Sequence, residues 1–226
     1  MGKGKLIVIE GTDGSGKATQ SKELLARLAK ENIPTAYFDF PQYGQKSAGM
    51  VENYLNGLYG SASEVNPRVA SMFYAMDRYD ASFKMKKDLK EGKTVICNRY
   101  VSANMGHQTG MISGKDERIK YLNWLEELEF NFFNIPRPDM VILLYVPYLV
   151  AQKMVDKKGH RDYVGGSKRD ILEADTDHLR KAEGAYIEVA KRYNWKVIDC
   201  TRNGEILPVP AIHEMIWKEV KKVLDN

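Results

Sequence analysis

The chain has 226 residues, of which 43% are hydrophobic and 28% are charged, and its formal net charge is +4 at pH 7. This length suits a single domain over residues 1–226, and the composition excludes a disordered or membrane-embedded chain. Because the charge is small and scattered, we expect no nucleic-acid partner. The longest apolar run, residues 140–146, is far shorter than the ~20 residues that a membrane span needs, so no membrane partner is expected.

Short apolar runs alternate with longer segments of helical period along the chain. The runs occupy residues 5–10, 35–40, 94–100, 139–146 and 195–200. Strands rich in Val and Ile that are separated by helices indicate a parallel sheet covered on both faces. The sequence therefore predicts an α/β fold with three layers.

The first run enters a glycine-rich turn with the sequence EGTDGSGKATQ, residues 10–20. A strand that leads into such a turn and then a helix places backbone N–H groups and the positive helix end around an anion. Lys17 brings a positive charge to the transferred phosphoryl group. The residues predicted to bind ATP are Gly11, Thr12, Asp13, Gly14, Ser15, Gly16, Lys17, Ala18 and Thr19.

Ala18 departs from this phosphate-binding pattern, G-x-x-x-x-G-K-[ST], which has a hydroxyl at that position to contact magnesium. Thr19 is rotated by ~100° around the helix and is not a simple substitute. Mg²⁺ usually keeps several waters and takes much of its coordination shell from substrate phosphates. We therefore expect Mg²⁺ as a cofactor that binds mainly through nucleotide phosphates and water, and its protein ligands stay unassigned.

Two helices are predicted in the middle of the chain. Asn66 and Pro67 form an N-cap and first-turn pair, and this helix should end near Gly92. The positions expected to form its buried stripe are Val69, Met72, Phe73, Met76 and Phe83. The second helix, at about residues 115–133, has more apolar surface than one face needs, so the excess is either core or a dimer contact.

Residues 156–170 show no periodicity, contain two adjacent glycines and are rich in basic side chains, which predicts a mobile loop. Cys97 and Cys200 end apolar runs and lack C-x-x-C spacing. Buried free thiols in a reducing compartment are therefore expected, with the cytoplasm as the location.

Five motifs occur in register along nearly the whole chain: EGTDGSGK (10–17), FPQYG (40–44), YAMDR (74–78), NRY (98–100) and PDMVILLYV (138–146). In this combination and order the chain resembles the thymidylate kinases. The resemblance implies a P-loop fold with a central five-stranded parallel sheet, commonly as a homodimer. It also implies transfer of the γ-phosphoryl group of ATP to dTMP, which gives dTDP and ADP.

The resemblance also implies roles for single residues. Asp13 matches a loop carboxylate beside the acceptor nucleotide, and Arg99 matches the arginine of a D-R-Y motif. Tyr74 matches an aromatic residue that stacks on thymine, and Arg78 matches an arginine that holds the acceptor phosphate. Because these two residues lie four positions apart on a helix, their side chains share one face and are ~5.4 Å apart along the helix axis. The implied acceptor-binding residues are Asp13, Phe40, Pro41, Tyr43, Tyr74, Arg78, Arg99, Asn104 and His107.

Three positions depart from the family pattern. Asn98 replaces the acid of the D-R-Y motif, and together with Ala18 this weakens the expected protein contribution to the metal. Gly14 occupies a position where some relatives carry a catalytic arginine. Relatives without it supply an arginine from a lid, which directs attention to Arg161 and Arg169. The predicted catalytic residues are Asp13, Lys17, Arg99, Arg161 and Arg169.

Two other functions are kept open. In a deoxynucleoside kinase, a carboxylate after the second strand, here Asp39, would accept the proton of the 5′-hydroxyl. Arg78 and Arg99 favour an acceptor that already carries a phosphate. A non-catalytic nucleotide-binding protein would account for Ala18 and Asn98 together, but it leaves the retained phosphate-directed cations unexplained.

Overall fold

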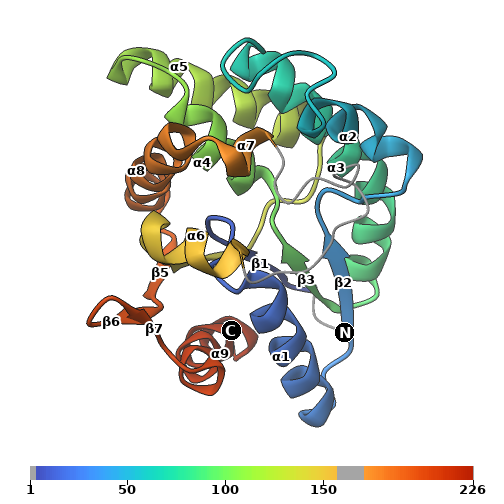
Figure 1. Ribbon diagram of the computed structural model, residues 1–226. Helices are drawn as coiled ribbons and strands as arrows, with labels where there is room; N and C mark the ends of the chain where they lie inside the picture. Colours follow the sequence, from blue (N-terminus) through green and yellow to red (C-terminus); the bar gives the residue numbers. More distant parts are fainter. Residues whose placement is uncertain (1–3, 157–170, 226) are drawn as a thin grey trace.

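The computed structural model describes residues 4–156 and 171–225. Within these ranges five strands form a parallel sheet in the order β2-β3-β1-β4-β5 (Figure 1). They are β1 (Leu6–Glu10), β2 (Thr35–Asp39), β3 (Thr94–Asn98), β4 (Met140–Tyr145) and β5 (Lys196–Asp199). Each strand lies within a predicted apolar run, so the predicted α/β class and parallel sheet are confirmed.

The helices of the described ranges surround this sheet. They are α1 (Lys17–Lys30), α2 (Gly49–Leu55), α3 (Pro67–Lys90), α4 (Val101–Gly110), α5 (Lys115–Glu126), α6 (Tyr148–Asp156), α7 (Ile171–Ala174), α8 (Thr176–Arg192) and α9 (Val209–Leu224). Shorter elements are the 3-10 turn η1 (Lys46–Ala48), the π-helical turn η2 (Glu127–Phe132) and the antiparallel pair β6 (Thr201–Arg202) and β7 (Glu205–Ile206).

Alternate residues of β1 point to opposite faces of the sheet and build two cores. Leu6 and Val8 pack in a cluster with residues of α3, α4, α5 and α8. Ile7 and Ile9 pack in a second cluster with residues of α1 and α9, which lie together on the other side (Figure 1). Inner strands such as β1 and β4 are buried along nearly their whole length and are apolar at nearly every position, and this is why they were recognisable from composition.

Helix α3 begins where the sequence predicts. The Asn66 side chain accepts a hydrogen bond from the backbone N–H of Arg68, and Pro67 occupies the first turn. The helix ends at Lys90, close to the predicted end near Gly92.

The buried stripe predicted for α3 is wrong for most of its members. The exposed fractions are 45% for Val69, 47% for Met72, 49% for Met76 and 61% for Phe83, whereas Phe73 is partly buried. The inward side of α3 includes small and polar residues, namely Ala70, Ser71, Ala75, Asp77, Arg78, Ala81 and Ser82. Since apolar residues occupy both sides of this helix, their spacing alone cannot select the side that faces the sheet.

The second predicted helix is confirmed as α5 continued by η2. Leu122 and Leu125 are buried in the core, and Phe132 is exposed. Most of the apolar excess on this helix is therefore core. Cys97 and Cys200 are buried and free, as predicted.

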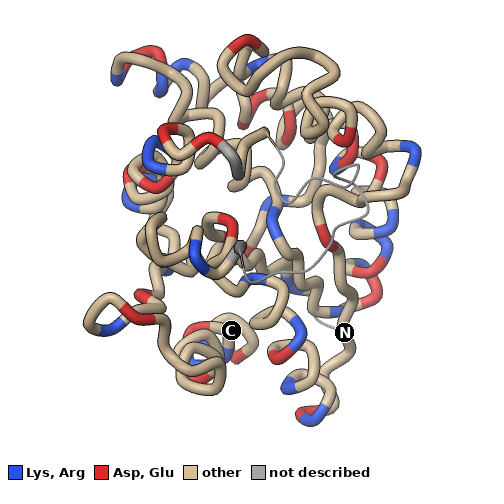
Figure 2. The backbone as a smooth tube through the Cα atoms, in the orientation of Figure 1, with Lys and Arg blue, Asp and Glu red and all other residues tan. Residues whose placement is uncertain are grey.

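The surface of the described ranges carries mixed charge. In the view of Figure 2, basic and acidic residues are interspersed along the helices. Among the helices that the structure describes, none combines the length and the apolar character that a bilayer crossing requires. The segment predicted to be a mobile loop lies, from residue 157 to residue 170, outside the described residues.

Candidate functional site

A cavity of about 300 Å³ opens at the carboxyl ends of β1, β2 and β3. From the phosphate loop and α1 it is lined by Asp13, Gly14, Gly16, Lys17, Ala18 and Thr19. The predicted acceptor residues that line it are Phe40, Pro41, Tyr43, Tyr74, Arg78, Arg99, Asn104 and His107. The structure therefore brings the predicted ATP loop and the predicted acceptor residues into one cavity, at the edge where open α/β sheets bind ligands.

The phosphate loop is folded around the amine of Lys17. Its Nζ donates hydrogen bonds to the carbonyl oxygens of Gly11 at 2.9 Å and Thr12 at 2.8 Å. Gly16 precedes α1 with a φ of 86°, a left-handed conformation that favours glycine. Thr12 and Ser15 are buried and shape the loop from inside, with the Ser15 N–H donating to the Thr12 carbonyl at 3.2 Å.

Gly14 is packed against α6. A Cβ atom at this position would lie 2.1 Å from the carbonyl oxygen of Ala151, and the φ of Gly14 is 84°. An arginine at position 14 therefore requires α6 to move away. The catalytic arginines predicted instead, Arg161 and Arg169, lie outside the described residues.

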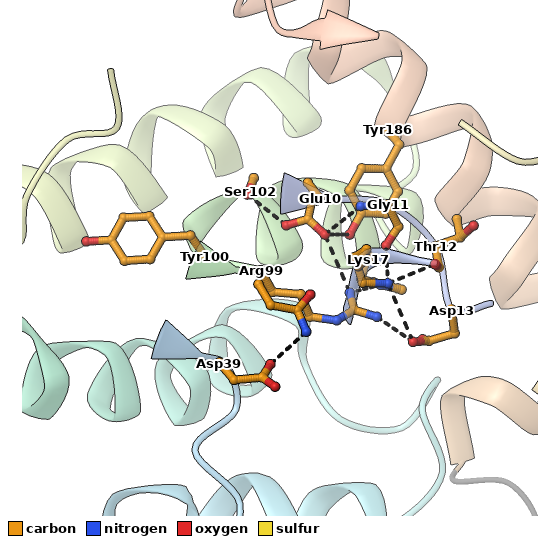
Figure 3. A network of polar contacts seen from close by, with 12 residues as sticks. Glu10, Gly11, Thr12, Asp13, Lys17, Asp39, Arg99, Tyr100, Ser102 and Tyr186 are labelled. Carbon is orange, nitrogen blue, oxygen red and sulfur yellow. Dashed lines mark hydrogen bonds and ion pairs between the residues drawn. The ribbon is translucent and has the colours of Figure 1, made fainter. Parts of the chain in front are cut away.

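Arg99 connects the loop to the acceptor side of the cavity (Figure 3). Its backbone is left-handed, with a φ of 66°, a strained conformation of the kind found at functional sites. Nη2 donates to Oδ1 of Asp13 at 2.5 Å, and Nη1 lies 3.6 Å from Oε1 of Glu10. Burial would lower the pKa of Arg99, but the nearby Asp13 and Glu10 carboxylates raise it above its ordinary value.

Glu10 is a buried carboxylate that the sequence analysis did not identify. Its Oε1 accepts from the Gly11 N–H at 2.9 Å and from the Tyr186 hydroxyl at 3.1 Å. Its Oε2 accepts from the Ser102 hydroxyl at 2.7 Å (Figure 3). A lone charged residue at the end of the apolar run LIVIE, directly before the loop, was the available signal.

Arg78 forms a buried ion pair, which differs from the expected phosphate clamp. Its Nε and Nη2 each donate to a carboxylate oxygen of Glu129 at 2.6 Å, and its Nη1 lies 3.4 Å from the Tyr100 carbonyl oxygen. Because Glu129 occupies the guanidinium fork, the pair carries no net charge toward a phosphate. Glu129 lies between Leu128 and Phe130, but Glu126 and Glu127 are close by, so the sequence did not single it out.

The other acceptor-side residues are held firmly. The Asn104 amide donates to the Ser71 carbonyl at 3.1 Å, and Asn104 is 2% exposed. Tyr74 is half-buried and meets Tyr54 edge to face at 6.3 Å between ring centroids. The Phe40–Pro41 peptide bond is cis, and the Phe40 ring is part of the core cluster.

His107 and His178 extend the Arg99 network with stacked rings, 5.4 Å apart. Arg99 Nη1 lies 3.2 Å from His107 Nε2, and His107 Nδ1 lies 3.2 Å from His178 Nε2. A guanidinium can only donate, so His107 Nε2 accepts and its Nδ1–H donates to His178. Burial lowers the pKa of both imidazoles, and the Arg99 charge lowers the pKa of His107 further.

Asp39 and Asn98 end neighbouring strands and stand opposite each other in the parallel register. Asn98 Nδ2 donates to Asp39 Oδ1 at 2.8 Å, and burial raises the pKa of Asp39. Asn98 Oδ1 is buried and has no hydrogen-bond partner. Within the described ranges no group of three or more His, Cys, Asp or Glu residues could hold a metal ion, so a metal here would depend on other oxygens as well.

The buried histidines should make stability depend on pH. Free imidazoles in the unfolded chain titrate near ~6.5, whereas the folded His107 and His178 resist protonation. The free energy of unfolding should be retained above pH 6.5 and should fall below it, with a limiting slope of about 1.4 kcal/mol per pH unit for each histidine that stays unprotonated in the folded state. In urea titrations at pH 5 to 8, His107→Gln should show a shallower decline than the wild type; equal slopes between pH 5 and 6.5 would contradict this.

Breaking the buried ion pair should strongly destabilise the fold. Glu129→Gln leaves the Arg78 charge buried without its partner, and we expect a loss of about 3–5 kcal/mol in the free energy of unfolding. Asp177→Asn makes the same change in an exposed ion pair with Arg180 and should have far less effect. Replacing both partners, Arg78→Met with Glu129→Leu, should recover much of the loss. Equal effects of the two single changes in urea unfolding would argue against this account.

Comparison with known proteins agrees with this geometry. The chain matches the family model described as thymidylate kinase over residues 9–208. A probable thymidylate kinase of Methanocaldococcus jannaschii is 30% identical over 96% of this chain and 96% of its own length. The thymidylate kinase of Pelotomaculum thermopropionicum is 31% identical over 99% of this chain and 95% of its own length.

A solved thymidylate kinase from Candida albicans shares the fold, with a TM-score of 0.71 at 19% identity, covering 97% of this chain and 92% of that chain. The family match runs from the end of β1 to the start of α9 and so includes every strand end that forms the cavity. The chain belongs to the thymidylate kinase family.

Proposed function

We propose that this protein transfers the γ-phosphoryl group of ATP to dTMP and releases ADP and dTDP. The observation that carries the proposal is the network around Arg99, which binds Asp13 of the phosphate loop and contacts His107 on the opposite side of the cavity. We call that side the acceptor wall; it is lined by Phe40, Pro41, Tyr43, Tyr74, Arg78, Asn104 and His107. Family membership supplies the substrate class. The cavity supplies one space in which a donor loop and an acceptor wall meet.

The donor side fits a polyphosphate. Lys17 now binds two neutral carbonyl oxygens, and phosphate oxygens would offer its amine stronger, charged acceptors. The glycines of the loop allow backbone N–H groups to approach those oxygens closely. ATP binding therefore needs a local exchange of partners at Lys17.

The acceptor side fits a nucleoside monophosphate with Arg99, rather than Arg78, at its phosphate. Since the Arg78 fork is occupied by Glu129, the remaining Nη1 suits a neutral oxygen such as a base carbonyl. Tyr74 offers a half-buried aromatic face for a base. Arg99 donates to Asp13 through one nitrogen, whereas its Nη1 contacts His107, so this side of the guanidinium can turn to a phosphate where the two substrates would meet.

The acidic and basic residues that line the cavity are equal in number, so the phosphates of two nucleotides would need additional cations. The charged lining residues are three acids and three bases: Asp13, Lys17, Asp39, Asp77, Arg78 and Arg99. Phosphoryl transfer gathers negative charge and proceeds by positioning and cationic stabilisation. We propose that Mg²⁺ accompanies ATP and neutralises charge on its phosphates, and that Arg161 and Arg169 add the remaining positive charge.

The exposed face of α3 fits self-association. Val69, Met72, Met76 and Phe83 follow one another at intervals of 3, 4 and 7 residues, which places them on one side of the helix. Large exposed apolar patches mark interaction surfaces. We propose that this α3 face joins two copies of the chain into a homodimer.

We further propose that residues 1–226 act as one kinase domain in the cytoplasm. Each of the two core clusters that pack on the sheet joins residues of β1 to residues of a helix late in the chain, α8 in one cluster and α9 in the other. This fits one folding unit. The buried free thiols of Cys97 and Cys200 fit a reducing compartment.

The activity can be tested with a panel of acceptors. ADP release with dTMP, dUMP and thymidine should be fastest with dTMP, and faster release with thymidine would favour a deoxynucleoside kinase. ATP and dTMP binding without ADP release at high magnesium would favour a non-catalytic protein. Arg99→Met should lower kcat/KM for dTMP by about 100-fold or more, because a charge at the transferring group is lost. Arg180→Met, on an exposed helix surface, should leave it unchanged.

The homodimer can be tested by mass. Wild-type protein should show twice the chain mass of 25.8 kDa in light scattering. Met76→Lys places a charge in the α3 face and should shift the mass to that of one chain. Met50→Lys is a matched control, since Met50 is 50% exposed on α2, outside this face. A wild type that is monomeric at assay concentration would overturn the proposal.

A further inference from the structure

Asp39 and Asn98 face each other at the ends of neighbouring strands, where both line the cavity. Position 98 ends β3 and carries an amide, while the carboxylate stands directly across the register on β2. Both residues line the cavity together with Lys17 and Ala18. The acid at this edge of the sheet therefore lies on β2, next to the amide on β3.

The amide of Asn98 has a defined orientation. Only the amide nitrogen can donate to the Asp39 carboxylate, and it does so at 2.8 Å. The opposite atom, Oδ1, is then directed away from Asp39, and it is buried without a partner in a residue that is 7% exposed. A buried acceptor left unpaired is costly, so it indicates a donor that arrives with the ligand.

The carboxylate of Asp39 is only partly compensated. Burial raises its pKa, whereas Tyr37, Arg99, Asn98 and Lys17 lower it. No Lys or Arg of the described ranges lies within ion-pair distance of it, since Lys17 is bound by loop carbonyls and Arg99 by Asp13. A carboxylate without an ion pair repels a polyphosphate in the same cavity. A divalent cation that arrives with the polyphosphate removes this repulsion, and its bound waters are the hydrogen-bond donors that Asn98 Oδ1 lacks.

We propose that Asp39 and Asn98 together are this chain's site for the Mg²⁺ that accompanies ATP, with Asp39 as the charged partner and Asn98 Oδ1 as acceptor from a metal-bound water. The inference rests on the proposed kinase function, because that function brings the phosphates. It explains how the chain tolerates Ala18: the missing hydroxyl of α1 and the missing acid of β3 are offset by one acid on β2.

Metal affinity, measured without turnover, tests this inference. The probe is Mn²⁺, followed by electron paramagnetic resonance, added to the full chain with a non-hydrolysable ATP analogue. Asp39→Asn should weaken Mn²⁺ binding about tenfold, in the range typical of lost outer-shell partners. The same change should leave unaltered, or tighten, the affinity for the analogue without metal, because a repulsive charge is removed. Opposite effects on the two affinities are not expected of a merely structural residue.

Two further variants complete the test. Asp199→Asn removes an exposed carboxylate at the end of β5, outside the cavity lining, and should change neither affinity. The exchange of both residues, Asp39→Asn with Asn98→Asp, returns the acid to β3 and should restore Mn²⁺ affinity to near the wild-type value. Unchanged Mn²⁺ affinity in Asp39→Asn, or an exchange variant that folds and binds the analogue but stays as weak, would overturn the inference.

Failure of the proposed function would look different. Wild-type protein assayed in parallel that binds the analogue and Mn²⁺ but never phosphorylates dTMP would overturn the kinase proposal while the metal measurements still decide the role of Asp39. Wild-type turnover of dTMP combined with an unchanged Mn²⁺ affinity in Asp39→Asn would overturn the metal site alone.

Discussion

One guanidinium, that of Arg99, sets the relative position of the two halves of the cavity. It lies at the end of β3 between Asp13 of the phosphate loop, Glu10 of β1 and His107 of α4. A guanidinium is planar and rigid, so groups bound around it are fixed relative to one another. The loop and the acceptor wall therefore cannot move independently while this network is intact, and the strained backbone of Arg99 is the cost of that arrangement.

The charges of the cavity are largely paired before any nucleotide binds. Arg78 is neutralised by Glu129, and Arg99 by Asp13, so the described lining offers little net attraction to a bare polyphosphate. Under the metal-site proposal, a cavity with this balance of charge that also contains Asp39 favours nucleotides that carry a counter-ion.

The strands and the phosphate loop could be predicted from sequence, because buried parallel strands are apolar throughout and the loop backbone requires glycine at set positions. The residues of the acceptor wall were predicted from family motifs. Such motifs indicate which residues form the site, but not which side chains they contact. The pairing of Arg78 was not predicted because its partner, Glu129, lies 51 positions away and tertiary packing joins them. The face of α3 was misjudged because apolar side chains such as Met76 and Met85 occupy both of its sides.

The contact between Gly14 and Ala151 distinguishes two arrangements of the loop: a glycine at position 14 with α6 packed against it, or a larger side chain there with α6 farther away. With the present α6, a side chain in the loop collides with a backbone oxygen, and backbone cannot yield as a flexible side chain would. A side chain at position 14 requires α6 to be displaced, so the sequence of the loop and the position of a helix that is remote in sequence are coupled.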